Sequence, residues 1–141
     1  MHLSLGKEGN QRGGCKEFAM YELMIKTSFA SAHNLRDYEG ACERLHGHNW
    51  RVDVFVKADS LDSIGLALDF KILKEKTRNI IEELDHKYLN EIEPFTEINP
   101  SSENMARYLF KRLSEGLTHY PVKVSKVTVW ESENACASYY E

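Results

Sequence analysis

Polar and hydrophobic residues alternate along several stretches of this chain, and a period of two is typical of half-buried β-strands. The first stretch is 21–33, and a clearer one is 46–58, in which Trp50 and the valines that follow it share one parity. Alternation returns at 123–131, and a short stretch, 135–140, follows a Ser-Glu-Asn break that is typical of a hairpin. The pattern predicts two pairs of strands.

Between these pairs the hydrophobic spacing becomes helical. Asp69 can cap a helix that carries apolar residues at helical spacing from Phe70 and ends near Leu84. A second amphipathic helix is predicted over about 101–117. Its apolar stripe consists of Met105, Leu109 and Leu113, and its candidate N-caps are Asn99, Ser101 and Ser102. The order ββααββ predicts an α+β fold with an antiparallel four-stranded sheet.

Length and composition limit the classes of function. The 141 residues suit one domain, which we predict over 20–141, after a flexible, polar and Gly-rich extension over 1–19. The net charge is −4 and the basic residues are interspersed with acidic ones, which favours a small-molecule partner over nucleic acid. Three cysteines without regular spacing favour the cytoplasm over a disulfide framework. No apolar run is long enough to span a membrane, and no secretory signal is recognisable.

A pair of histidines at the start of the second strand is the first candidate site. His46 and His48 are two residues apart, so a strand places both imidazoles on one face. His33, at the end of the neighbouring predicted strand, is a third candidate ligand. Three histidines with an open fourth position are typical of catalytic zinc. On spacing alone, a surface pair or a hydrogen-bonded pair explains His46 and His48 equally well.

Cys42 lies four residues before His46, in the loop that leads into the second strand. A cysteine beside a cation has a lowered pKa and can act as a base. Two alternatives remain open for Cys42, because it could be a fourth metal ligand or simply a small buried residue.

Asp85 and His86 follow the predicted end of the first helix. Adjacent on a turn, the carboxylate can orient the imidazole as an acid or base. The alternative is structural: Asp85 caps a turn, and His86 sits where a helix C-terminus favours a cation.

Glu131 shares the strand parity of Val127 and Val129, so it is expected to face the same way as these valines. A carboxylate on an apolar face needs a partner, and two parallel N–H donors of an amino-pyrimidine ring would match its two oxygens. Alternatively the parity breaks at the end of the strand, and Glu131 is solvated together with Glu133.

Five segments, in this order, resemble one known family: CERLHGHNW, GLALDFKILK, LDHKYLN, NPSSEN and VTVWE. The chain from Met20 onward is similar to the 6-pyruvoyl-tetrahydropterin synthases and 6-carboxytetrahydropterin synthases. The resemblance implies the tunnelling fold (T-fold), with two helices on one face of the sheet. It also implies a homohexamer, built from two trimers, whose active sites lie between subunits.

The same resemblance implies roles for the candidate residues. The metal ligands are His33, His46 and His48, with Zn²⁺ as cofactor, and the proton-transfer residues are Cys42, Asp85 and His86. Glu131 is implied to anchor the pterin, and Ser101, Ser102 and Glu103 are implied to line its pocket. Threonine is the more usual family residue at the position of Ser101, which keeps the hydroxyl but loses the methyl group.

The implied reaction is the zinc-dependent conversion of 7,8-dihydroneopterin triphosphate to 6-carboxy-5,6,7,8-tetrahydropterin for queuosine biosynthesis, with release of acetaldehyde and triphosphate. Animal-type members instead keep the side chain and are 6-pyruvoyl-tetrahydropterin synthases. Glu43, directly after Cys42, resembles the glutamate of members that cleave the side chain to 6-hydroxymethyl-7,8-dihydropterin for folate synthesis, although it could be a solvated loop charge. An alternative without catalysis is a pterin-binding or zinc-storage protein.

Overall fold

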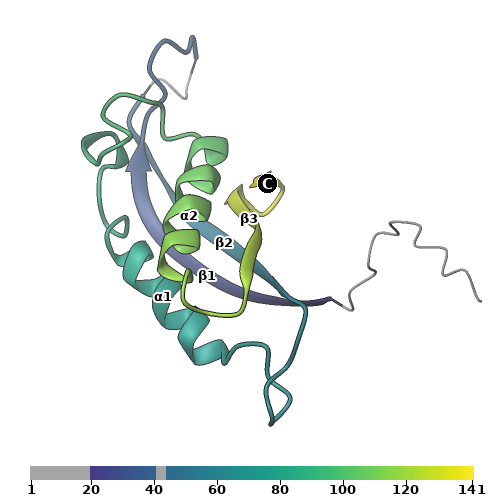
Figure 1. Cartoon of the computed structure of the whole chain (residues 1–141). Coiled ribbons are helices and arrows are strands. Elements are labelled where there is room, and N and C mark those ends of the chain that lie inside the picture. The colour runs from purple at the N-terminus through teal and green to yellow at the C-terminus, as the bar shows by residue number, and fades with distance from the viewer. Residues whose placement is uncertain (1–19, 41–43) are drawn as a thin grey trace, which may run out of the picture.

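The computed structural model describes residues 20–40 and 44–141, which form one sheet with two long helices on one side of it (Figure 1). Its elements are β1 (Tyr21–His33), β2 (His46–Ala58), α1 (Phe70–Glu82), the short 3-10 helix η2 (Leu89–Glu91), α2 (Ser102–Gly116), β3 (Lys123–Ser132) and β4 (Ala135–Tyr139). The strands pair antiparallel in the order β1-β2-β3-β4. This confirms the predicted ββααββ order and the antiparallel sheet. The predicted extension, 1–19, lies outside the described residues.

The pairing of β1 with β2 decides where the histidines lie. The strands pair without a shift from Tyr21 opposite Ala58 to His33 opposite His46. The inward parity of β2 is buried as the sequence predicts, beginning with Trp50. Because both strands are regular to this end, the residues that close the ladder are brought together by backbone hydrogen bonds alone.

Asp53 departs from the predicted alternation, because it lies on the polar parity of β2 and is nevertheless buried. Its Oδ2 accepts a hydrogen bond from Trp130 Nε1 of β3 at 2.8 Å. The Arg51 guanidinium stacks over the Trp130 ring, 4.3 Å from its centroid, and its Nε lies 3.7 Å from Asp53 Oδ1. Neighbouring strands can therefore bury a polar residue whose own strand predicts exposure.

Helix α1 begins as predicted but differs in one apolar position. The Asp69 side chain caps it by accepting from Lys71 N at 2.8 Å. The predicted inward position of Phe70 is wrong: this first helical residue is 48% exposed, while Leu73 and Thr77 carry the buried face. The helix ends at Glu82, two residues before the predicted end, because the next residues form tighter turns, in which Glu83 N donates to Ile80 O and Leu84 N to Ile81 O.

Helix α2 follows the prediction closely. Of the three candidate caps, Ser101 is the one used, and its hydroxyl accepts from Asn104 N at 3.2 Å. The predicted apolar stripe is fully buried against the sheet. The largest enclosed side chains of the shared core include Trp50, Phe95, Leu73, Leu84, Leu89, Met105, Leu109, Leu113 and Leu117. No helix among residues 20–40 and 44–141 is long and apolar enough to cross a membrane.

Truncation of this stripe tests the packing. We expect Leu109→Ala to lower the free energy of unfolding by about 2–5 kcal/mol, because Leu109 has no exposed surface and the cavity left behind can close only partly. Urea denaturation measures the change. Ile64→Ala, at a side chain that is 78% exposed, is the control and should change stability by less than about 0.5 kcal/mol. Equal effects of the two substitutions would contradict the described packing.

Candidate metal centre

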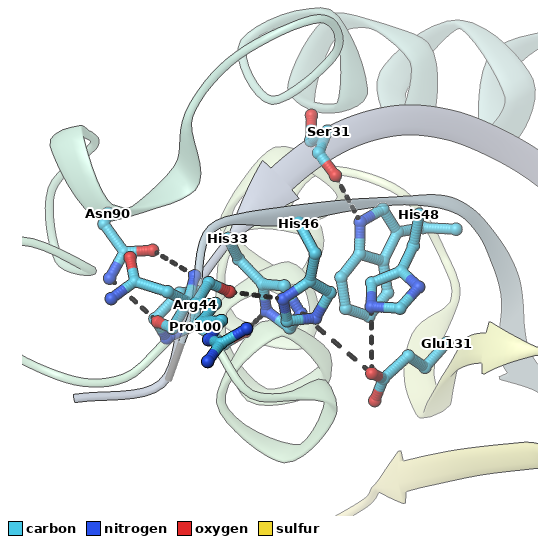
Figure 2. Close-up of polar contacts among 10 residues, drawn as sticks. Ser31, His33, Arg44, His46, His48, Asn90, Pro100 and Glu131 are labelled. Atoms are coloured by element: carbon cyan, nitrogen blue, oxygen red, sulfur yellow. Dashed lines mark hydrogen bonds and ion pairs between the residues drawn. The ribbon is translucent and has the colours of Figure 1, made fainter. Parts of the chain in front are cut away.

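Three histidine side chains converge where β1 ends and β2 begins (Figure 2). His33 Nε2 lies 3.0 Å from His46 Nε2. The candidate ligand atoms of His33, His46, His48 and Glu131 all lie within 4.8 Å of one another. We call these four residues the metal cluster. The structure thus brings together the three predicted histidines and adds a carboxylate to them.

Backbone carbonyls fix the proton on two of the imidazoles. His33 Nδ1 lies 2.8 Å from Pro100 O, and His46 Nδ1 lies 2.6 Å from Arg44 O. Because a carbonyl oxygen can only accept, both Nδ1 atoms carry the proton. Both Nε2 atoms therefore present lone pairs, and these face one another across 3.0 Å. This contact is unfavourable unless a cation lies beside it, so the arrangement fits a metal ion.

His48 supplies an independent indication of a metal. Its Nε2 atom is buried and has no hydrogen-bond partner among the described residues. Glu131 Oε1 lies 3.0 Å away but does not meet the geometry of a hydrogen bond. A buried nitrogen without a partner is costly, and coordination to a metal would remove that cost. The donor set of imidazoles and one carboxylate is one that zinc accepts.

Glu131 reaches the cluster from the end of β3, as Figure 2 shows. Its Oε1 atom lies 3.0 Å from His48 Nε2 and 4.0 Å from His33 Nε2. From the sequence, Glu131 was expected to bind the pterin ring and was not placed beside the histidines. Its position follows from the pairing of Arg51 with Trp130, which brings the end of β3 next to the start of β2.

The environment keeps two of the histidines neutral. Burial lowers the pKa of His33 below 6.5, and the neighbouring His46 and His48 lower it further, against the hydrogen bond to Pro100 and the charge of Glu131. Burial also lowers the pKa of His48, opposed by Glu131. A neutral imidazole is the form that binds a metal, so the cluster is ready for coordination at neutral pH.

The pKa shifts predict how metal binding depends on pH. Protons compete with the metal only as the pH falls through the histidine pKa values, and those of His33 and His48 lie below 6.5. We therefore expect zinc affinity to stay nearly constant from about pH 8 to about pH 7 and to fall at more acidic pH than for unperturbed histidines. Competition titrations with a chelator measure this. A fall in zinc affinity between about pH 8 and about pH 7 as steep as the fall at more acidic pH would contradict the lowered pKa values of His33 and His48.

Trp50 encloses the cluster from the sheet side. Its ring meets His33 and His48 edge to face, with centroids 4.9 Å and 5.0 Å apart. Trp50 is fully buried and donates its Nε1–H to Ser31 O at 3.2 Å. The strand period places Trp50 on the same face as His46 and His48, and the ring contacts agree with this placement.

Asp85 and His86 lie in the turn that follows α1, along the side of β1 that faces away from β2. Asp85 Oδ1 accepts from Ala30 N at 2.9 Å, and Asp85 Oδ2 lies 3.0 Å from His86 Nδ1. His86 has a φ of 55°, which is uncommon for a residue other than glycine, and its N–H donates to Ala30 O at 2.6 Å. The predicted pair is therefore formed and anchored to the edge of β1.

The same contacts set the charge of this pair. The hydrogen bond from Ala30 N, followed by contacts with His86, lowers the pKa of the Asp85 carboxyl. The His86 side chain is 81% exposed. No hydrogen bond or ion pair among the described residues connects Asp85 or His86 to the metal cluster. Within one chain, the structure thus presents an oriented imidazole to solvent, on a segment that is hydrogen-bonded along the edge of β1.

The remaining predicted residues lie at the start of α2 or outside the described residues. The Ser101 hydroxyl is occupied as the N-cap, Ser102 is buried, and Glu103 is exposed in the first turn. This segment adjoins the metal cluster through Pro100, whose carbonyl holds His33. Cys42 and Glu43 lie outside the described residues.

Comparison with known proteins agrees with this fold. Residues 22–141 match the family model described as 6-pyruvoyl tetrahydropterin synthase. The chain is 37% identical over 101 residues to the 6-carboxy-5,6,7,8-tetrahydropterin synthase of Synechocystis sp., covering 68% of this chain and 77% of that protein. It is 32% identical to the dihydroneopterin monophosphate aldolase of Pyrococcus furiosus, covering 77% and 88%. The 6-pyruvoyl tetrahydropterin synthase structure of Caenorhabditis elegans superposes with a TM-score of 0.79 at 25% identity, covering 88% and 97%. The predicted T-fold is therefore confirmed.

Proposed function

Because the chain belongs to the 6-pyruvoyl tetrahydropterin synthase family of pterin-processing enzymes, we propose that it converts 7,8-dihydroneopterin triphosphate and water to 6-carboxy-5,6,7,8-tetrahydropterin, acetaldehyde and triphosphate. The main support is the metal cluster, in which the Nε2 atoms of three histidines converge beside Glu131. No N–H or O–H group among the described residues donates a hydrogen bond to these atoms. The 37% identity to a protein named for this product supports the choice of product.

We assign zinc to the cluster, with His33, His46 and His48 as ligands, because this donor set is typical of catalytic zinc. Zinc bound there would polarise the oxygens of the substrate side chain and increase the acidity of the adjacent C–H groups. Glu131 lies beside these ligands, which suits contact with the reacting side chain as well as the predicted pterin anchor. Glu103 is exposed at the start of α2 and is a second carboxylate available to the pterin ring, with Ser101 and Ser102 beside it.

Proton transfer is assigned to Cys42 and to the Asp85–His86 pair. Cys42 acts as a thiolate and removes a proton from the substrate side chain. A nearby cation would lower the pKa of its thiol. His86, oriented by Asp85 Oδ2 at 3.0 Å, delivers or accepts the second proton. The hydrogen bond from Ala30 N lowers the pKa of Asp85, so its carboxylate accepts from the backbone and lies beside His86 Nδ1 at the same time.

The separation of the two sites supports an assembly. Asp85 and His86 face outward from the edge of β1, while the metal cluster lies where β1 meets β2. A second subunit could bring its own pair to this cluster, as expected for a homohexamer of two trimers with active sites between subunits. We place the enzyme in the cytoplasm and in queuosine biosynthesis, with residues 20–141 as its single domain.

A second candidate is cleavage of the side chain to 6-hydroxymethyl-7,8-dihydropterin, alone or beside the first activity. The 32% identity to an aldolase that acts on dihydroneopterin monophosphate favours it, and Glu43 is the residue that would carry it. A 6-pyruvoyl-tetrahydropterin synthase is the remaining enzymatic alternative, and a pterin-binding or zinc-storage protein is the alternative without catalysis.

Mass spectrometry of the products from 7,8-dihydroneopterin triphosphate tests these proposals. We expect the 6-carboxy product and acetaldehyde from the wild type and neither from Cys42→Ala. The hydroxymethyl product, abolished by Glu43→Ala, would identify the second activity, and a retained three-carbon side chain would identify the pyruvoyl enzyme. Zinc binding without release of triphosphate and without any new pterin product would overturn the enzymatic proposals.

A further inference from the structure

The backbone that follows β1 stays hydrogen-bonded on its outer side, although no strand among the described residues lies there. Asn90 accepts from Asn34 N at 3.0 Å through Oδ1 and donates to Asn34 O at 2.9 Å through Nδ2. Asn99 makes the same pair of contacts with Arg36, accepting from its N–H at 2.9 Å and donating to its carbonyl at 3.0 Å. The two side-chain amides therefore replace the hydrogen bonds that a neighbouring strand would make.

Asn99 differs from Asn90 in its contacts outside the segment that follows β1. Its backbone carbonyl accepts from Asn104 Nδ2 at 2.9 Å, and the next residue is Pro100, whose carbonyl accepts the Nδ1–H of His33. Asn99 is thus tied to Arg36 on one side and to helix α2 on the other. The Pro100 carbonyl lies in the short segment between these attachments, so its direction depends on both.

That direction matters because Pro100 O is the acceptor that keeps the proton of His33 on Nδ1. If the carbonyl turns away, buried His33 loses this acceptor, and the proton can move to Nε2. A protonated Nε2 cannot bind a metal. The side chain of Asn99 itself lies outside the metal cluster, so its influence on the metal would be exerted through Pro100 and His33.

We infer that Asn99 is a positioning residue of the metal centre, which fixes the Pro100 carbonyl and through it the orientation and tautomer of His33. The inference rests on the proposed function in one respect, namely that the cluster binds a metal. It assigns to Asn99 an effect on metal affinity that Asn90 does not share, although each side chain makes two hydrogen bonds to the segment that follows β1.

The test compares Asn99→Ala with the matched variant Asn90→Ala in the full chain. Zinc affinity is measured by competition with a chelator, and the cobalt-substituted proteins are compared by visible absorption, which reports the ligand geometry. We expect Asn99→Ala to bind zinc about 10–100-fold more weakly than the wild type and to change the cobalt spectrum. Asn90→Ala should lie within about 3-fold of the wild type, with its spectrum unchanged.

Thermal unfolding of the metal-free variants separates this effect from a general loss of stability, since a similar fall in Tm is expected for both. If Asn99→Ala does not fold, Asn104→Ala removes only the contact to Asn99 O, and a smaller loss of zinc affinity in the same direction supports the inference. Equal zinc affinities and spectra for Asn99→Ala and Asn90→Ala, or for Asn104→Ala and the wild type, would overturn it. Absence of zinc binding by the wild type would instead overturn the proposed metal site.

Discussion

Replacing His46 with alanine is expected to abolish stoichiometric metal binding, with a loss of zinc affinity of more than about 100-fold. His46 Nε2 faces His33 Nε2 at 3.0 Å, so its removal leaves two histidines and Glu131 to hold the ion. His46 is less buried than His33, so its loss should disturb folding less than the loss of His33. Elemental analysis of the purified variant and chelator competition measure the effect, and triphosphate release should fall with metal content.

His119→Ala is the control for this experiment, because His119 is exposed in the turn after α2. It should keep one zinc per subunit and full activity. In the wild type, zinc at about 100 times its Kd should stabilise the fold by about 2.7 kcal/mol, and His46→Ala should lose this increment. A His46→Ala protein that retains one zinc per subunit with unchanged affinity would remove His46 from the ligand set.

The second large effect is expected for Asp85→Asn, which should lower kcat by about 10²–10⁴-fold while leaving zinc content unchanged. Asparagine can keep an oxygen acceptor for Ala30 N, so the turn retains its anchor to β1. The substitution removes the negative charge that lies 3.0 Å from His86 Nδ1 and that orients the imidazole. Steady-state kinetics with the triphosphate substrate separate the effect on kcat from any effect on KM.

Asp62→Asn offers a matched control. Asp62 Oδ1 also accepts from backbone N–H groups, those of Ile64 and Leu66, but it lies in the loop after β2. Its substitution should leave kcat within about 2-fold of the wild type. If Asp85→Asn behaves like Asp62→Asn, Asp85 serves only as an acceptor for the backbone of β1, and the proton-transfer role assigned to the pair is wrong.

Local pattern was sufficient for the four strands and the two long helices of this fold, but not for η2. The alternation from Tyr21 to His33 and from His46 to Ala58 predicted both strands with their observed ends, and a Ser cap preceded α2 as expected. These features depend on neighbours within a few residues, through the period of a strand or the first turn of a helix. The error at Phe70 has the same origin, because spacing identifies an apolar stripe better than it identifies the boundary residue that faces outward.

Local pattern was also sufficient to identify two candidate functional pairs. His46 and His48 share a face because a strand has a period of two, and Asp85 and His86 meet because they are adjacent in a turn. The assignment of roles to these pairs depended on the family resemblance, since spacing alone left a structural explanation open for each. Cys42 and Glu43 remain predictions from sequence.

The chemistry of the cluster, in contrast, was decided by tertiary contacts. Pro100 O reaches His33 across 67 positions of the chain, and Asp85 reaches Ala30 across 55. Glu131 joins the histidines because β3 pairs with β2 in one register, and a shift of one residue would turn its side chain to the other face. The primary sequence thus determines the candidate ligands and the strands that carry them. The lone pair on His33 Nε2 and the burial of His48 Nε2, in contrast, follow only from how distant segments pack.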